Sequence, residues 1–146
     1  MPGDLIVAHA RIVTAEAVLT GSLAVAGGRI ADLDRDESCP PGAVDFEGDY
    51  LLPGLVELHT DNMERHFSPR PGVRWPAVSA ALAHDAQIAA AGITTVFDAV
   101  SLGSMQDHDL RLIALAEMLD GTRTAQDSGM FRSEHLLHLR CEVSYP

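Results

Sequence analysis

Strand and helix patterns alternate from residue 54 onward, and this alternation constrains the fold more than any other feature. An apolar run after Pro53-Gly54 predicts a strand that ends near His59 and Asp61. The β-branched run at 93–98 predicts a strand buried on both faces, and residues 136–143 predict a third strand.

Helices are predicted between these strands. Alanine is frequent over 77–91, and Pro76 and Gly92 suit the two ends of a helix. Apolar residues at helical spacing predict a second helix over 107–119, and a further helical stretch is expected near 125–131. The order strand–helix–strand–helix–strand indicates an α/β fold with a parallel sheet over residues 54–146.

Residues 1–53 have a different pattern of short apolar runs. Gly27-Gly28 separates two such runs and predicts a β-hairpin, while residues 39–42 break the pattern. We expect a small antiparallel β unit in this region, without catalytic groups.

Composition excludes several classes of partner. The net charge of −11 argues against a nucleic-acid or anionic-membrane surface, and every basic side chain other than histidine is arginine. Cys39 and Cys141 are far apart in sequence, which favours two reduced thiols in a cytoplasmic protein. We expect no signal peptide and no membrane-spanning segment.

His59 and Asp61 form the first candidate site. Residues i and i+2 of a strand point to the same face, so an imidazole and a carboxylate would emerge together at the strand end. Such a pair suits a divalent cation, although a structural histidine and a capping aspartate are the alternative. Asp98 and Glu142 are also predicted near strand ends, where parallel α/β folds place their chemistry.

Three arginines follow this strand in a loop rich in proline and glycine. Arg65, Arg70 and Arg74 are concentrated in an otherwise acidic chain. Guanidinium groups bind phosphate through paired hydrogen bonds, so the loop is predicted to bind substrate phosphates. A solvated surface loop is the alternative.

Several longer motifs resemble the amidohydrolase superfamily, and in particular a branch of it that acts in phosphonate catabolism. The motifs are residues 57–62, 69–73, 75–79, 84–88 and 138–143. The resemblance implies a (β/α)8 barrel, of TIM type, beside a small β-sandwich. It also implies metal-dependent hydrolysis of α-D-ribose 1-methylphosphonate 5-triphosphate, with release of pyrophosphate.

The same resemblance implies roles for individual residues. His59, Asp61 and Glu142 are expected to bind zinc, manganese or magnesium, because superfamily members use a glutamate or a carboxylated lysine as a further ligand. The catalytic base of the superfamily comes from a later strand and is not expected in this chain.

From the residues themselves, His66 and His84 are expected at the surface or behind a metal ligand, and Asp98 is expected to cap a helix or to orient a ligand. His138 has the same side-chain parity as Glu142, so it either shares that face or is a core histidine, and the core position is favoured.

The chain is much shorter than the members of the family that it resembles. Three strand–helix units do not close a barrel, so the chain is predicted to be an amino-terminal part of a longer enzyme, inactive alone. The expected partner is a small-molecule ribosyl triphosphate, with a homo-oligomer possible for the complete protein. The alternatives are an amidohydrolase acting on a cyclic amide or amine, and an inactive remnant or interaction piece.

Overall fold

The computed structural model describes residues 4–36, 38–102 and 108–141. Its contacts divide the chain into two compact units, Met1–Pro53 and Gly54–Pro146. Glu142, one of the predicted metal ligands, lies outside the described residues. Within the described residues, no helix is both long and apolar enough to cross a membrane.

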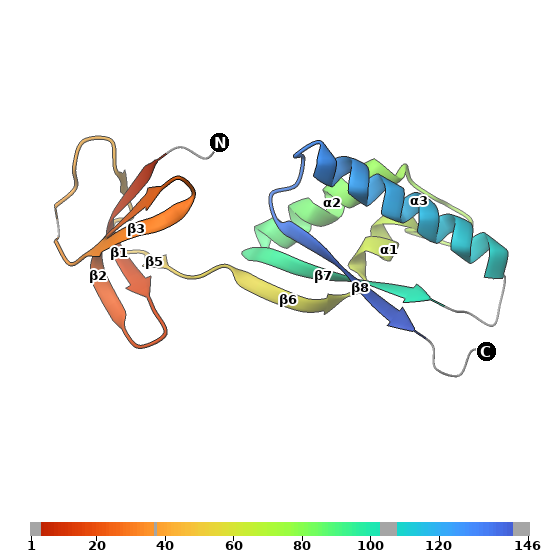
Figure 1. The fold of residues 1–146 in the computed structure, drawn as a ribbon, viewed down its shortest axis with the longest axis horizontal. Helices are drawn as coiled ribbons and strands as arrows, with labels where there is room; N and C mark the ends of the chain where they lie inside the picture. Colours follow the sequence, from red (N-terminus) through yellow and green to blue (C-terminus); the bar gives the residue numbers. More distant parts are fainter. Residues whose placement is uncertain (1–3, 37, 103–107, 142–146) are drawn as a thin grey trace. The chain divides into compact units, whose positions relative to one another are not determined.

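The first unit is a five-stranded sheet in the order β3-β2-β1-β4, with β5 also paired to β1 (Figure 1). Its strands are β1 (Leu5–Val13), β2 (Val18–Ala26), β3 (Arg29–Asp34), β4 (Val44–Asp45) and β5 (Tyr50–Leu51). The predicted hairpin joins β2 to β3 through Gly27 and Gly28, whose φ angles are +58° and +76°. Positive φ at both positions is the geometry that favours glycine in a two-residue hairpin turn.

The prediction of a purely antiparallel unit is wrong. Strands β1 to β3 pair antiparallel, but β4 and β5 both run parallel to β1. The segment after β3 returns the chain to the end at which β1 begins, so Val44 pairs with Val7 in the same direction. The sequence showed the break at 39–42 but did not show where the chain would go after it.

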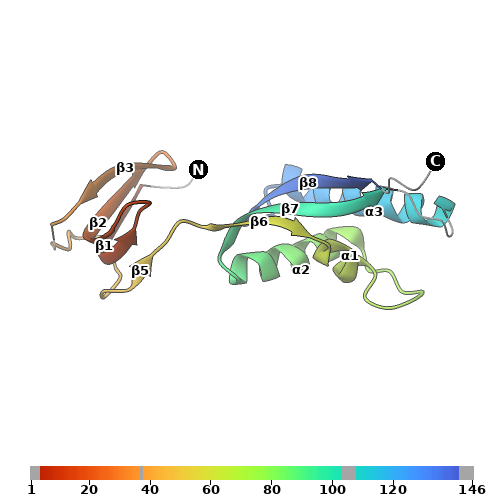
Figure 2. The same ribbon diagram turned by 90° about the horizontal axis from the view of Figure 1, so that it is seen from below.

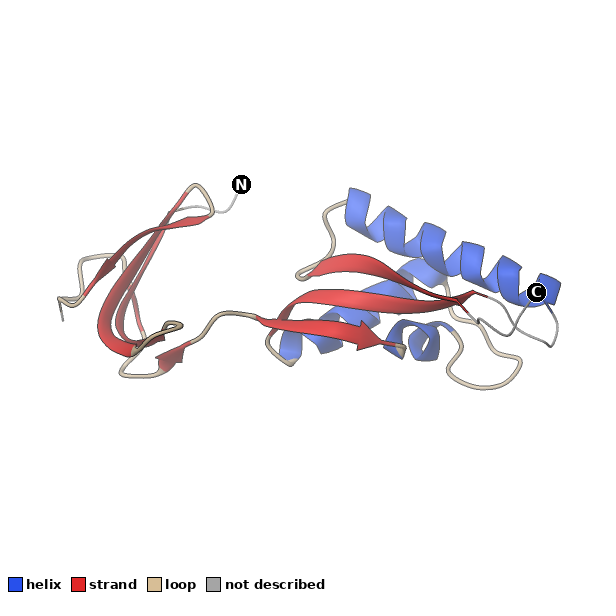
Figure 3. Ribbon diagram, turned by 60° about the horizontal axis from the view of Figure 1, so that its bottom comes forward, coloured by secondary structure: helices blue, strands red, loops and turns tan. Residues whose placement is uncertain are grey.

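The second unit is a three-stranded parallel sheet in the order β6-β7-β8, with helices on one face (Figures 2 and 3). Its elements are β6 (Leu55–Thr60), α1 (Asn62–Phe67), α2 (Ala77–Ala90), β7 (Ile93–Leu102), α3 (His108–Asp127) and β8 (Glu134–Cys141). Met63 and Phe67 of α1, Ala80 and Ala81 of α2, and Val100 of β7 form part of its core. This mixed α/β architecture agrees with the predicted class, and the described residues form no closed barrel.

Two helices differ from their predicted extents. The segment after Asp61 was expected to be loop, but it starts with α1, which buries Met63 and Phe67 one turn apart. Helix α3 continues to Asp127 instead of ending near residue 119 and restarting. It passes through Gly121, which is buried against the start of α2, where a Cβ atom would lie 2.7 Å from the carbonyl carbon of Ala77.

Replacing Gly121 with alanine is therefore expected to destabilise the fold, although alanine normally favours a helix by about 1 kcal/mol over glycine. The added methyl group would overlap Ala77 and force α2 and α3 apart, at a cost of about 1–3 kcal/mol. Urea unfolding of the complete protein measures the change. Asp120→Ala, at the exposed neighbouring position of the same helix, is the control. A more stable Gly121→Ala variant would contradict the close approach of α2 and α3.

Among the described residues, β6 and β8 are the two edge strands of the second unit's sheet. Large apolar side chains on these strands are exposed, including Leu58 at 68% and Leu139 at 52%. Exposed apolar strands at a sheet edge favour pairing with further strands. The edges thus agree with the expectation that three strands are part of a larger sheet.

Candidate functional site

Four side chains meet at the carboxyl ends of β6 and β8, and we refer to them as the strand-end cluster: His59, Asp61, His138 and Arg140. Nε2 of His59 lies 3.8 Å from Oδ2 of Asp61. Nη1 of Arg140 lies 3.2 and 3.3 Å from the two carboxylate oxygens of Asp61. The His59 and His138 rings pack edge to face with centroids 5.1 Å apart.

The register of the parallel sheet explains why these residues meet. Ala99 of β7 pairs with His138, and Ser101 pairs with Arg140. The alternate residues Asp98 and Val100 are buried with the helix layer, so His138 and Arg140 lie on the opposite face of the sheet. The side chains of His59, Asp61 and Arg140 each remain nearly half exposed, which leaves them accessible to a ligand.

His138 corrects one prediction from sequence. It was expected to be a core residue, but its ring is partly exposed and its Nδ1 lies 3.3 Å from the backbone oxygen of Leu58. That contact reaches across the sheet from β8 to β6, past the small residue Ala99 of β7. His138 therefore belongs to the surface that carries His59.

The predicted phosphate-binding arginines lie away from these contacts. Arg65 is exposed on α1, Arg70 forms an isolated bridge with Val73, and Arg74 lies 3.4 Å from Glu117 of α3. Residues 68–74 line a solvent-open concavity on the surface of this loop. The prediction that this loop binds phosphate stays a prediction, and the arginine that contacts Asp61 is a different one.

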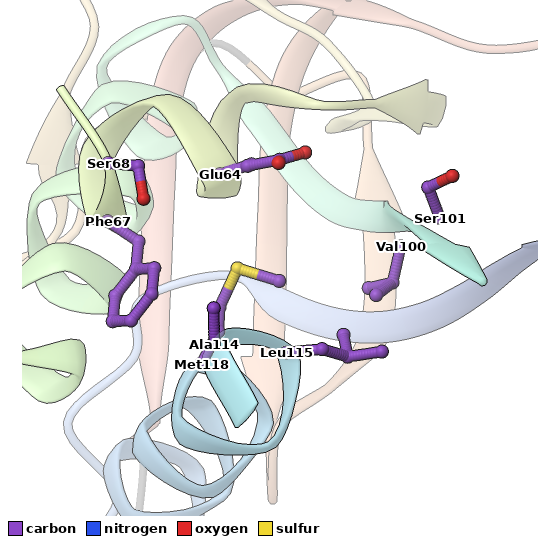
Figure 4. A pocket seen from close by; sticks show the side chains of 8 residues that line it. All are labelled: Glu64, Phe67, Ser68, Val100, Ser101, Ala114, Leu115 and Met118. Atoms are coloured by element: carbon purple, nitrogen blue, oxygen red, sulfur yellow. The ribbon is translucent and has the colours of Figure 1, made fainter. Parts of the chain in front are cut away.

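A smaller pocket lies between α1, α3 and the end of β7 (Figure 4). Its volume is about 40 Å³, and Glu64, Ser68 and Ser101 provide its polar side chains. The other lining residues are Phe67, Val100, Ala114, Leu115 and Met118. This space suits one or a few water molecules and is too small for a nucleotide-sized substrate.

A second group of polar residues is buried between the sheet and α2, and we call it the buried network: His84, Asp85, Asp98 and His135. Nε2 of His84 and Nδ1 of His135 each lie 2.7 Å from a different oxygen of Asp98. Nε2 of His135 also lies 3.4 Å from Asp85, which accepts hydrogen bonds from the backbone N–H groups of Arg132 and Ser133. The network joins α2, β7, β8 and the segment before β8.

Hydrogen bonds in this network shift the pKa values of Asp98 and His135 in the direction opposite to the effect of burial. Burial alone would raise the pKa of Asp98, but hydrogen bonds from His135 and His84 hold that pKa below its usual value. Burial would also lower the pKa of His135, but hydrogen bonds and charge attraction from Asp98 and Asp85 raise it. Both shifts favour the charged forms of Asp98 and His135.

Stability is expected to depend on pH in both directions because of these shifts. Below pH about 6.5, the ordinary pKa of histidine, the contribution of charged His135 is fully present, and it is lost as the pH rises through the raised pKa of His135. The contributions of Asp85 and Asp98 are present above their ordinary pKa and are lost as the pH falls through their lowered values. Unfolding measured from pH 3 to 9 should show a maximum between these limits. The decline on the alkaline side should disappear in His135→Gln, and an unchanged decline would contradict the assignment.

The buried network also has the residue types of a metal site. The ligand atoms of His84, Asp98 and His135 lie within 4.8 Å of one another. Two ligands of one zinc ion stand about 3.3 Å apart, given bonds of about 2.0–2.1 Å at tetrahedral angles. The 2.7 Å contacts to Asp98 are instead hydrogen-bond lengths, so protons hold this network in the observed geometry.

Comparison with known proteins identifies the family of this chain. No known protein-family profile matches the chain. The α-D-ribose 1-methylphosphonate 5-triphosphate diphosphatase of Escherichia coli K12 is 46% identical over 141 residues, 97% of this chain. An allantoinase of Streptomyces avermitilis is 37% identical over 98 residues, 65% of the chain. The chain belongs to the amidohydrolase superfamily. It spans 37% of the diphosphatase and 20% of the allantoinase, which agrees with the prediction that the sequence is part of a longer protein.

Amidohydrolases are typically metal-dependent, and the strand-end cluster, like the buried network, has donor types that bind a divalent cation. The 3.8 Å between His59 and Asp61 needs little adjustment for both to bind one ion. The guanidinium of Arg140 already neutralises the carboxylate of Asp61, so a metal ion bound there would have to displace this contact. The nitrogen and oxygen donors are of the types that bind zinc, manganese or magnesium.

Asp98 and His66 lie elsewhere in this amidohydrolase chain than their predicted role suggests. Asp98 was placed near a strand end, but β7 continues to Leu102 and the carboxylate of Asp98 faces the helix layer. Nε2 of His66 lies 2.9 Å from the side-chain oxygen of Gln87, and its ring lies 5.7 Å from that of His84. Both residues are therefore associated with the buried network, and their predicted role in orienting a metal ligand stays a prediction.

Sequence reasoning missed several residues of these two groups. His84 was expected at the surface or behind a metal ligand, but it is fully buried, and its Nδ1 has no hydrogen-bond partner among the described residues. Asp85, His135 and Arg140 were not singled out at all. The sequence signal for Arg140 was its i, i+2 spacing from His138, which places both side chains on one face of β8. Asp85 had no local signal, because its partners lie 47–50 residues further along the chain.

Proposed function

We propose that the complete protein is a metal-dependent hydrolase that releases pyrophosphate from α-D-ribose 1-methylphosphonate 5-triphosphate in phosphonate catabolism. The observation that carries this proposal is the strand-end cluster, where an imidazole, a carboxylate and a guanidinium lie side by side on an open sheet face. The similarity to a diphosphatase with this substrate in its name supports the same reaction.

His59 and Asp61 would hold the cation, with Glu142 as a further ligand. A bound divalent ion would polarise a phosphoryl oxygen and lower the pKa of a water molecule. Arg65, Arg70 and Arg74 would supply positive charge to the polyphosphate from the loop after α1. Asp98 and His66 would act indirectly, and the general base would come from outside residues 1–146.

The direct test is a substrate panel with the complete protein and added zinc, manganese or magnesium. Pyrophosphate release from the ribosyl triphosphate is expected, together with a ribosyl 5-phosphate product. The match to an allantoinase supports a second candidate, hydrolysis of a cyclic amide. Turnover of cyclic amides without pyrophosphate release would favour that candidate and contradict the diphosphatase proposal.

A further inference from the structure

We propose that Arg140 binds a phosphate group of the substrate, and that a cation on Asp61 strengthens this binding by releasing the guanidinium from the carboxylate. This inference rests on the proposed function and adds a specific anion-binding residue to it. The ligand class is a polyphosphate oxyanion.

The guanidinium of Arg140 has donors to spare. Both of its contacts to Asp61 use Nη1, at 3.2 and 3.3 Å. A guanidinium carries five N–H donors in a fixed planar arrangement. In the part of the chain that the structure describes, the donors on Nε and Nη2 of Arg140 therefore remain available for a second acceptor.

The position of Arg140 suits an anion that also approaches the cation. Its side chain is 44% exposed, and it lies beside Asp61 on the open face of the sheet. Its planar group matches two oxygens of one phosphate. A chain with a net charge of −11 needs such local positive charge to hold a triphosphate.

Asp61 links the two binding events. Its carboxylate neutralises Arg140 in the observed structure, and the same oxygens are the expected cation ligands. A cation on Asp61 would therefore release the guanidinium for a phosphate. Because such coupling is reciprocal, phosphate bound to Arg140 would also favour cation binding at Asp61.

The test measures binding of inorganic tripolyphosphate to the complete protein by calorimetry, without added metal. Arg140→Ala is expected to weaken binding about ten- to a hundredfold, the range for a lost hydrogen bond to a charged group. Asp61→Asn should tighten binding, because the guanidinium loses its competing carboxylate. Arg123→Ala is the matched control, since Arg123 is 82% exposed on α3 and pairs with Asp127. A structural role for Arg140 would predict equal affinities for Arg140→Ala and Arg123→Ala and no gain in Asp61→Asn, and this result would overturn the proposal.

The outcome is separable from that of the proposed function. Weakened tripolyphosphate binding in Arg140→Ala, with no pyrophosphate released from the ribosyl triphosphate by the wild type, would leave the anion site standing and reject the reaction. Pyrophosphate release by the wild type, with unchanged tripolyphosphate binding in both Arg140→Ala and Asp61→Asn, would reject the anion site alone.

Discussion

Asp61→Ala in the complete protein is expected to lose most of its bound divalent metal and nearly all pyrophosphate release. Removal of groups that merely orient a metal ligand typically costs ten- to a hundredfold in affinity or activity, so loss of a ligand should cost about a hundredfold or more. His59→Ala should behave in the same way, because His59 is the nitrogen donor next to Asp61. Metal content by elemental analysis and kcat/KM for pyrophosphate release measure the two effects.

A matched carboxylate elsewhere in the chain controls for charge. Asp45 of β4 also contacts a histidine, with its Oδ1 2.9 Å from Nδ1 of His9, and it is exposed. Asp45→Ala should keep wild-type kinetics, and kinetics are the comparison because His9, Cys39 and Asp45 also bring donor atoms within 4.8 Å of one another. If Asp61→Ala and His59→Ala keep wild-type metal content and kinetics, the strand-end cluster is not the metal site.

Replacing Asp98 with alanine is expected to produce the largest loss of stability. The change removes the partner of both His84 and His135, which are 0% and 1% exposed, and leaves His135 with the more distant Asp85 alone. Breaking a buried ion pair from one side costs about 3–5 kcal/mol. Chemical denaturation at neutral pH, followed by circular dichroism, measures this change.

Asp45→Ala again provides the comparison, since its carboxylate–imidazole contact is of similar length but exposed. An exposed pair contributes little to stability because water screens the charges. Equal losses in Asp98→Ala and Asp45→Ala would show that burial does not strengthen the network. The expected difference would also identify Asp98 as a structural residue at the centre of α2, β7 and β8.

The sequence predicted the parts of this fold that local patterns determine. The β-branched run at 93–98 predicted β7, and the alanine-rich segment predicted α2 almost to its ends. Helix α3 continues past residue 119, where the predicted helix ended, and Gly121 lies within it at the close approach to Ala77. That contact joins two helices and leaves no signal near residue 121 in the sequence.

The candidate site was likewise predicted only where a local sequence pattern determines it. The i, i+2 spacing of His59 and Asp61 predicted that their side chains lie together, and the structure places them 3.8 Å apart. Arg140 contacts Asp61 from a strand 79 residues away, and the partners of Asp98 come from α2 and β8. Such groups depend on strand order and register, which alternation along one strand does not reveal.

The separation between Asp61 and Arg140 also orders events during synthesis. A ribosome makes Asp61 before Arg140, which lies 79 residues further along the chain. During translation the carboxylate of Asp61 therefore exists for seconds before its guanidinium partner, given elongation at about 5–20 residues per second. His59 is already beside it in the chain, so both donors that we assign to the cation are present in the nascent polypeptide while the competing arginine is still unmade.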